Sequence, residues 1–263
     1  MKEFIQTLKN IWSLKELRDK IILTLTLVLV YRFASYVSLP AINMAEVGNL
    51  LQHYKNQGGN QQGAGLLGLL SSFTGGAFSR ASIMALGIMP YISASIIVQL
   101  MGMAIPYLQK LQKDGESGRN TLNQITRWLT IGVCLVQAPS YLTSVTQYFL
   151  PYSQFQSAYY IDPASIMFWL PSIVILVAGS VFAMWLGEKI TDKGIGNGIS
   201  ILIMVGILAD LPTAFYQEVL TQNGKGGLGS IMILVEIIFW LLVVLLAIIL
   251  SVAVRKIPIQ SVT

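Results

Sequence analysis

Residues 69–100 read "LLSSFTGGAFSRASIMALGIMPYISASIIVQL", and this stretch decides the fold class. Its first twelve residues are too apolar for an ordinary loop, yet too short and too rich in glycine to cross a bilayer. The remainder is a hydrophobic run of the length that spans a hydrocarbon core, about 20 residues. The sequence therefore places a short, flexible, half-inserted segment directly in front of a membrane span.

The composition of the whole chain also indicates a membrane protein. Of its 263 residues, 54% are hydrophobic and 11% are charged, and the mean hydropathy is +0.65. A soluble domain carries about 25% charged residues. We therefore expect an all-α polytopic membrane protein with six transmembrane helices. The expected spans are residues 21–39, 78–105, 122–148, 165–186, 196–216 and 229–254.

The distribution of basic residues predicts the orientation. Residues 1–20 place apolar side chains near helical spacing among lysines, which is typical of an amphipathic helix on the membrane surface. By the positive-inside rule, the side that collects most basic residues is cytoplasmic, and this puts the N-terminus in the cytoplasm. The other side keeps Lys55, Arg80 and Lys225. The basic side holds Lys2, Lys9, Lys15, Arg18, Lys20, Lys110, Lys113, Arg119, Arg127, Lys189, Lys193, Arg255 and Lys256.

Few residues are suited to catalysis or to metal binding. The chain has one cysteine, Cys134, in an apolar run, and one histidine, His53, in a polar loop. These counts exclude an internal disulfide framework, a cysteine metal cluster and a membrane-buried Ser–His dyad. Asp162 and Asp210 fall near span ends, which argues against an intramembrane aspartyl protease. We expect no enzyme activity, no cofactor, no metal and no direct nucleic-acid site.

Two ionisable residues, Arg32 and Glu236, fall inside predicted spans, where a charge is costly and often functional. Both are within reach of a span end, so extension of the side chain to the headgroups is the ordinary explanation. Their role stays open. Separately, Gly179, Ala183 and Gly187 recur every four residues along the fourth span, and such a stripe predicts close packing of a neighbouring helix.

Two pairs of isoleucines lie one helical turn apart. Ile88 and Ile92 flank Pro90, which we expect to remove a hydrogen bond inside the second span and so to loosen the helix locally. Ile199 and Ile203 follow "GEKITDKGIGNG" (187–198), a glycine-rich turn without the spacing of a nucleotide-binding loop. Spacing alone indicates side chains that face lipid or pack against neighbours.

Three ordered blocks carry a resemblance. "GGAFSRASIMALGIMPYISASIIVQL" (75–100), "KDGESGR" (113–119) and "WLGEKITDKGIGNGISILI" (185–203) closely resemble the SecY family, the pore-forming subunit of the Sec protein-conducting channel. The resemblance implies a ten-helix pseudosymmetric channel, of which this chain holds the first five-helix half plus span six. The expected parts are a cytoplasmic amphipathic helix (1–20), the five-span half (21–216) and an external loop, span six and the start of a cytoplasmic loop (217–263).

The resemblance also implies functional positions. The apolar pore ring would include Ile88, Ile92, Ile199 and Ile203. The lateral gate would include Ser93, Ile96 and Gln137. A movable plug would occupy residues 64–77, with Gly75 and Gly76 as its hinge. The plug positions are Leu66, Leu67, Leu69, Leu70, Ser71, Ser72, Phe73, Gly75 and Gly76.

The function that follows from the resemblance is passive. The protein would translocate unfolded secretory polypeptides across the cytoplasmic membrane and release membrane proteins sideways into lipid. The implied partners are small SecE- and SecG-type membrane subunits, the motor ATPase SecA or the ribosome, signal sequences and nascent chains. A secondary transporter with discontinuous helices is the alternative, but it requires polar groups near the midplane, and the four pore positions are isoleucines.

Overall fold

The computed structural model describes residues 13–43, 74, 76–78, 80–149, 152, 156–223 and 227–253. The chain divides into two compact units, Met1–Asp210 and Leu211–Thr263. Within the described residues the structure is helical, and the only β-type pairs there are two isolated bridges. The α-helices are α2 (Lys15–Tyr36), α5 (Met89–Ala104), α6 (Pro106–Lys113), α7 (Gly115–Ser144), α8 (Ile166–Lys193), α9 (Gly198–Asn223) and α10 (Gly227–Val252). Two short elements, η1 (Val145–Phe149) and η2 (Gln156–Ala158), lie between α7 and α8.

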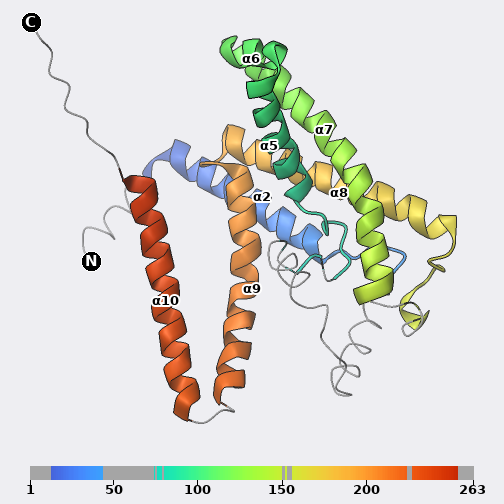
Figure 1. Cartoon of the computed structure of the whole chain (residues 1–263), viewed down its shortest axis with the longest axis vertical. Coiled ribbons are helices and arrows are strands. Elements are labelled where there is room, and N and C mark those ends of the chain that lie inside the picture. The colour runs from blue at the N-terminus through green and yellow to red at the C-terminus, as the bar shows by residue number, and fades with distance from the viewer. Residues whose placement is uncertain are drawn as a thin grey trace, which may run out of the picture. The chain divides into compact units, whose positions relative to one another are not determined.

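The first unit is organised around α7 and α8. Helix α7 packs against α5, α6 and α8, and α2 packs along α8 (Figure 1). Two hydrophobic clusters fill the spaces between these helices. One surrounds Leu142 and Phe168, near the junction of α7, η1 and the start of α8. The other surrounds Met84 and Leu186, and it includes residues from α2, α5, α8 and α9.

A proline explains the sharp break between α5 and α6. Ile105 precedes Pro106 and adopts an extended conformation, with φ −102° and ψ 117°. The ring of a proline disfavours the helical conformation of the residue before it, but proline itself fits the first turn of a new helix. Helix α5 therefore ends at Ala104, and α6 leaves it at an angle of 102°. Residues 106–121, which separate the second and third expected spans, are thus largely helical.

Side chains mark the starts of α8 and α9. Ser165 precedes α8, and its hydroxyl accepts a hydrogen bond from the Met167 N–H. Asn197 precedes α9, and its side-chain oxygen accepts from the N–H groups of Ile199 and Ser200. Both contacts satisfy backbone donors that the first turn of a helix leaves without a partner.

The described residues contain four helices long and apolar enough to cross a membrane, or five if α5 and α6 count as one bent span. The four are Gly115–Gln147, Ile166–Lys193, Gly198–Leu220 and Ile231–Val252. Helix α2, which covers the first predicted span, is not among them. It runs without a break from Lys15 and so includes the end of the predicted surface helix 1–20. Residues 1–12 of that helix lie outside the described residues.

The second predicted span, 78–105, begins later than expected. Residues 80–88 form turns and a bridge, and α5 starts at Met89. The backbone of the turns explains the difference, since φ is +46° at Ala81 and +56° at Gly87, in the left-handed region that a helix cannot contain. The hydrophobicity of this segment reflects burial within the protein, because Met84 and Ala85 have no exposed surface.

Candidate pore and lateral gate

The turn segment 80–88 is fixed to the end of α2 by the main chain. The Leu39 N–H donates to the Ala81 carbonyl over 2.8 Å, and the Ile83 N–H donates to the Val37 carbonyl over 2.9 Å. These bonds satisfy buried polar groups that no helix provides for. The residues that lead into α5 therefore have a defined position, although they are not helical.

Two aromatic side chains hold the same region from its sides. The Arg80 guanidinium lies over the ring of Tyr36, 4.5 Å from the ring centre, where a cation–π attraction operates. The Tyr141 hydroxyl on α7 donates to the Phe78 carbonyl over 2.7 Å, and the two rings meet edge to face. Arg80, at the start of the segment, is thus attached to α2, and Phe78, just before the segment, is attached to α7.

The start of α5 places the first isoleucine pair. Ile88 is the residue before the helix, with φ −95° and ψ −6°, and Pro90 lies within the first helical turn. Our expectation that Pro90 lies inside the helix and loosens it is therefore wrong. A proline in the first turn removes an N–H that has no helical acceptor there, so it starts the helix without kinking it. Ile92 follows one turn later, and its N–H donates to the Ile88 carbonyl.

The second pair is placed by a close crossing between α8 and α9. A β-carbon on Gly198 would clash with the Gly187 carbonyl, and a β-carbon on Gly187 would come within 2.9 Å of Ile199. Thr191 reinforces the crossing, since its hydroxyl donates to the Gly187 carbonyl and accepts from the Gly198 N–H, both over 2.9 Å. Ile199 and the start of α9 are therefore held against α8.

Thr24 fixes the turn before α9 to α2. Its hydroxyl accepts a hydrogen bond from the Ile195 N–H over 3.2 Å and donates to the Lys20 carbonyl over 2.8 Å. Thr24 itself is buried, and both bonds are partly shielded from water. Helix α2, the glycine-rich turn and α9 are thereby connected close to the second isoleucine pair.

All four expected ring residues belong to the cluster around Met84 and Leu186. Ile88 is buried, and Ile92, Ile199 and Ile203 are half-buried members packed against the same core. The structure therefore brings together two pairs that lie more than 100 residues apart in the sequence. Their side chains offer no hydrogen bonds to water or to ions, and this is the property that a hydrophobic constriction requires.

The expected gate residues lie on two helices that pack together, α5 and α7. Ser93 on α5 and Gln137 on α7 are both half-buried, and Ile96 is exposed over half of its surface. Of the expected plug, Gly76 is described, with φ +77°, as are Thr74 and Ala77. Leu66, Leu67, Leu69, Leu70, Ser71, Ser72, Phe73 and Gly75 lie outside the described residues.

A family model described as SecY matches residues 82–263. The chain belongs to the SecY family. It is 39% identical over 245 residues to a protein translocase subunit SecY of Buchnera aphidicola from Schizaphis graminum, covering 93% of this chain and 52% of that protein. The SecY of Escherichia coli K12 is 39% identical over 222 residues, which cover 84% of this chain and 47% of that protein.

A solved structure supports the fold. Sec61 in the canine ribosome–channel complex from the endoplasmic reticulum superimposes with a TM-score of 0.57 at 19% identity, over 91% of this chain and 49% of that one. The chain spans about half the length of the curated SecY proteins it matches. The structure is thus a multi-pass helical membrane protein with the SecY and Sec61 fold.

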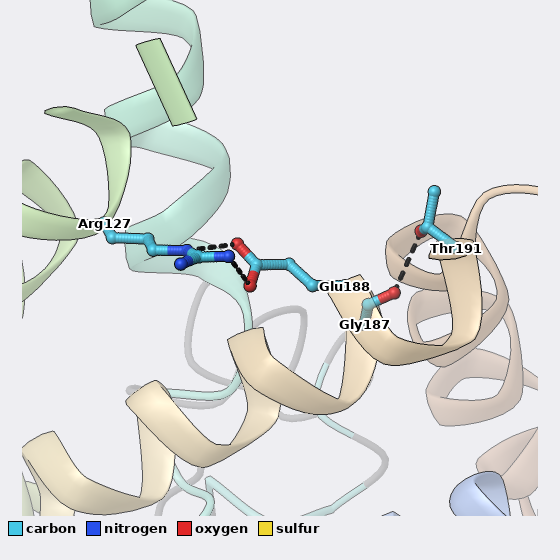
Figure 2. Close-up of polar contacts among 4 residues, drawn as sticks. All are labelled: Arg127, Gly187, Glu188 and Thr191. Atoms are coloured by element: carbon cyan, nitrogen blue, oxygen red, sulfur yellow. Dashed lines mark hydrogen bonds and ion pairs between the residues drawn. The ribbon is translucent and has the colours of Figure 1, made fainter. Parts of the chain in front are cut away.

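Among the polar contacts of this SecY chain that the sequence did not reveal is an ion pair between two helices. Arg127 on α7 makes a bidentate ion pair with Glu188 on α8, with nitrogen–oxygen distances of 2.9 and 2.7 Å (Figure 2). We call this pair the α7–α8 clamp. The glutamate stands beside Gly187, so the clamp is adjacent to the α8–α9 crossing. Arg127 was counted only among the basic residues, since no sequence pattern joins residues 61 positions apart.

The stripe on α8 packs closely, as predicted: at Gly187 its neighbour is helix α9, but at Gly179 its neighbour is not a helix. A β-carbon on Gly179 would clash with the Ile83 carbonyl, in the turn segment before α5, where we expected a helix. In the part of the chain that the structure describes, no three His, Cys, Asp or Glu side chains are arranged to hold a metal ion. The site is therefore built from apolar packing and close backbone contacts, with the clamp beside it.

Proposed function

We propose that this chain contributes one half of a passive protein-conducting channel in the cytoplasmic membrane, with its N-terminus in the cytoplasm. The channel moves unfolded polypeptides across the membrane and releases apolar segments sideways into lipid. The observation that carries the proposal is the shared cluster of Ile88, Ile92, Ile199 and Ile203. The helices that carry these isoleucines are held in place at their starts. Main-chain bonds to the end of α2 hold the turn before α5, and the close crossing with α8 holds α9.

The four isoleucines form part of a pore ring that closes the channel by dewetting. Branched apolar side chains line a constriction in which water has no hydrogen-bond partner, so ions are excluded until a polypeptide fills the space. Residues 64–77 form the plug, and Gly76, with its positive φ, serves in the hinge. Ser93, Ile96 and Gln137 line the gate through which a signal sequence reaches lipid.

The chain itself hydrolyses nothing in this proposal. The driving force comes from a motor ATPase of the SecA type or from a translating ribosome. Small SecE- and SecG-type subunits complete the assembly, and the channel opens by a hinge-like movement of its two halves. The apolar character of the ring favours this function over a secondary transporter, whose substrate site needs polar groups at membrane depth.

The proposal is tested by ion leakage. The complete protein, assembled with its small membrane subunits, is reconstituted into vesicles, and serine replaces each of Ile88, Ile92, Ile199 and Ile203. We expect a rise in chloride or potassium efflux for each variant, because a hydroxyl lets water wet the constriction. Ile97→Ser is the matched control, since Ile97 lies on the same helix, is exposed and is outside the cluster. Equal efflux from all variants and the control contradicts the ring assignment.

A further inference from the structure

A proline divides α7 into two parts. Pro139 lies inside the helix and has no N–H, so the Leu135 carbonyl loses the donor that the helical ladder would supply. Sharp bends in helices occur mostly at such prolines. The long part before the proline is residues 115–138, and the short part after it continues into η1.

The short part is fixed to the rest of the unit. The Tyr141 hydroxyl donates to the Phe78 carbonyl over 2.7 Å, and the two rings meet edge to face. Leu142 and Val145 are buried in the same hydrophobic cluster as Phe168. The short part therefore cannot move without opening this cluster.

The long part belongs to a tight corner with α5 and α6. A β-carbon on Gly102 of α5 would overlap the Gln112 side chain of α6, and one on Gly118 of α7 would clash with the Leu111 carbonyl. The ends of α5 and α7 are thus joined through α6. At its other end, α5 begins two residues after Gly87, whose left-handed φ lies outside the helix.

The buried face of the long part is smooth. It presents small side chains every four residues, namely Thr126, Thr130, Cys134 and Ala138. Both threonine hydroxyls donate to carbonyls of α7 itself. Such low ridges interlock less with a neighbouring helix than large side chains do. In the part of the chain that the structure describes, the α7–α8 clamp is the one ion pair that joins α7 to another helix.

The clamp lies where a bend at the proline would break it. Arg127 precedes Pro139 by 12 residues, which is about 18 Å along the axis at about 1.5 Å per residue. A bend of about 10°, half of a sharp proline kink, would move Arg127 by about 3 Å. The nitrogen–oxygen distances of the clamp are 2.9 and 2.7 Å, and such bonds are lost beyond about 3.5 Å. A bend away from α8 therefore opens the clamp.

We propose that α7 bends at Pro139, that α6 and residues 115–138 then swing as one arm away from α8, and that the α7–α8 clamp holds this arm in place. Gln137 belongs to the arm, and Ser93 and Ile96 lie on α5, which is joined to the arm at the corner. The clamp therefore controls how readily this side of the gate moves. That role rests on the function proposed above, whereas the bend itself does not.

The test is a distance measurement by pulsed electron spin resonance. The complete protein is assembled with its small membrane subunits in nanodiscs, and its native cysteines, including Cys134, are replaced by alanine. Spin labels at Gln124→Cys in the arm and Val174→Cys on α8 report the swing. Labels at Ser140→Cys and Val174→Cys form the control pair, because Ser140 follows the proline. All three labelled positions are exposed in the structure.

Opening the clamp should release the arm. Glu188→Gln should raise the displaced population of the first label pair about fivefold, the equivalent of the coupling of an exposed ion pair. The displacement at residue 124 is about 4 Å for the same bend. Arg127→Gln removes the other partner and should give the same increase, so the result does not depend on how one variant folds. The distance of the control pair should stay unchanged.

The proline is then tested in the same background. Pro139→Ala restores the N–H that bonds to the Leu135 carbonyl and should abolish the effect of Glu188→Gln. Pro212→Ala, which removes the proline inside α9, is the matched control and should leave that effect intact. The proposal is overturned if opening the clamp displaces nothing, if the displacement persists in Pro139→Ala, or if the control pair moves as well. No conductance is measured, so failure here leaves the pore ring untouched, and failure of the leakage test leaves the bend untouched.

Discussion

The α7–α8 clamp allows a quantitative prediction about how the first unit is held together. With the two charges about 4 Å apart and an effective dielectric constant of about 20, their attraction is about 4 kcal/mol. Ordering the two long side chains costs about 1.5 kcal/mol each. The net coupling is therefore about 1 kcal/mol. This is the upper end of the range for exposed ion pairs, as expected because bidentate pairs are stronger than pairs with a single hydrogen bond.

The two single variants should differ. The side chain of Arg127 is 49% exposed and that of Glu188 is 19% exposed. Removing the glutamate leaves a guanidinium that water can still reach, so Glu188→Gln should cost about 1 kcal/mol. Removing the arginine leaves a largely buried carboxylate without its counter-charge, so Arg127→Gln should cost about 2 kcal/mol.

The assay is a double-mutant cycle. Unfolding of the wild type, the two single variants and the double variant is followed by circular dichroism as sodium dodecyl sulfate replaces a mild detergent. The coupling should fall at an ionic strength of about 1 M, where the screening length is about 3 Å. A coupling below about 0.3 kcal/mol, which is within the error of additivity, refutes the reasoning. So does a larger cost for Glu188→Gln than for Arg127→Gln.

Two further predictions concern close contacts in the same unit. Gly179→Ala should destabilise by about 1–3 kcal/mol in the same unfolding assay, because the added methyl meets the Ile83 carbonyl, whereas Gly132→Ala, with open space around it, should stabilise by about 0.5–1 kcal/mol. Equal effects of the two alanines would show that the contact is not tight. Thr24→Val should release the turn before α9 and speed tryptic cleavage at residue 193 about fivefold, the equivalent of one hydrogen bond of about 1 kcal/mol. Thr26→Val is its control, since the exposed Thr26 hydroxyl bonds only within α2; cleavage that is equally fast in both variants would contradict the role of Thr24.

Hydrophobic blocks predicted where the helices lie, but they could not predict where α5 begins. Hydropathy measures the preference of side chains for an apolar environment, and lipid and protein interior satisfy that preference equally. Met84 and Ala85 are buried by protein in a turn segment, so their composition resembles that of a span. The positive φ values at Ala81 and Gly87 break the helix there, and alanine gives no warning of such a conformation.

The site was predictable only in part, and for a related reason. The two isoleucine pairs could be recognised from the resemblance, and the structure places them in one cluster. The contacts that hold them could not be recognised, because each joins distant positions through geometry. The bond from Ile195 to Thr24 spans 171 residues, and the clamp spans 61. The presence of a glycine also did not predict a close contact. A β-carbon on Gly132 would have open space around it, whereas one on Gly179 would clash with the main chain.

These contacts limit how the proposed ring can open. The backbone before Ile88 is bonded to the end of α2, and the start of α9 is locked against α8 through Gly187 and Gly198. The two isoleucine pairs are thus attached to a common frame of α2 and α8. Within this chain, widening must come from rotation of the isoleucine side chains or from bending of α5 and α9 beyond their anchored ends. A larger opening requires the frame to move as one body against the rest of the channel.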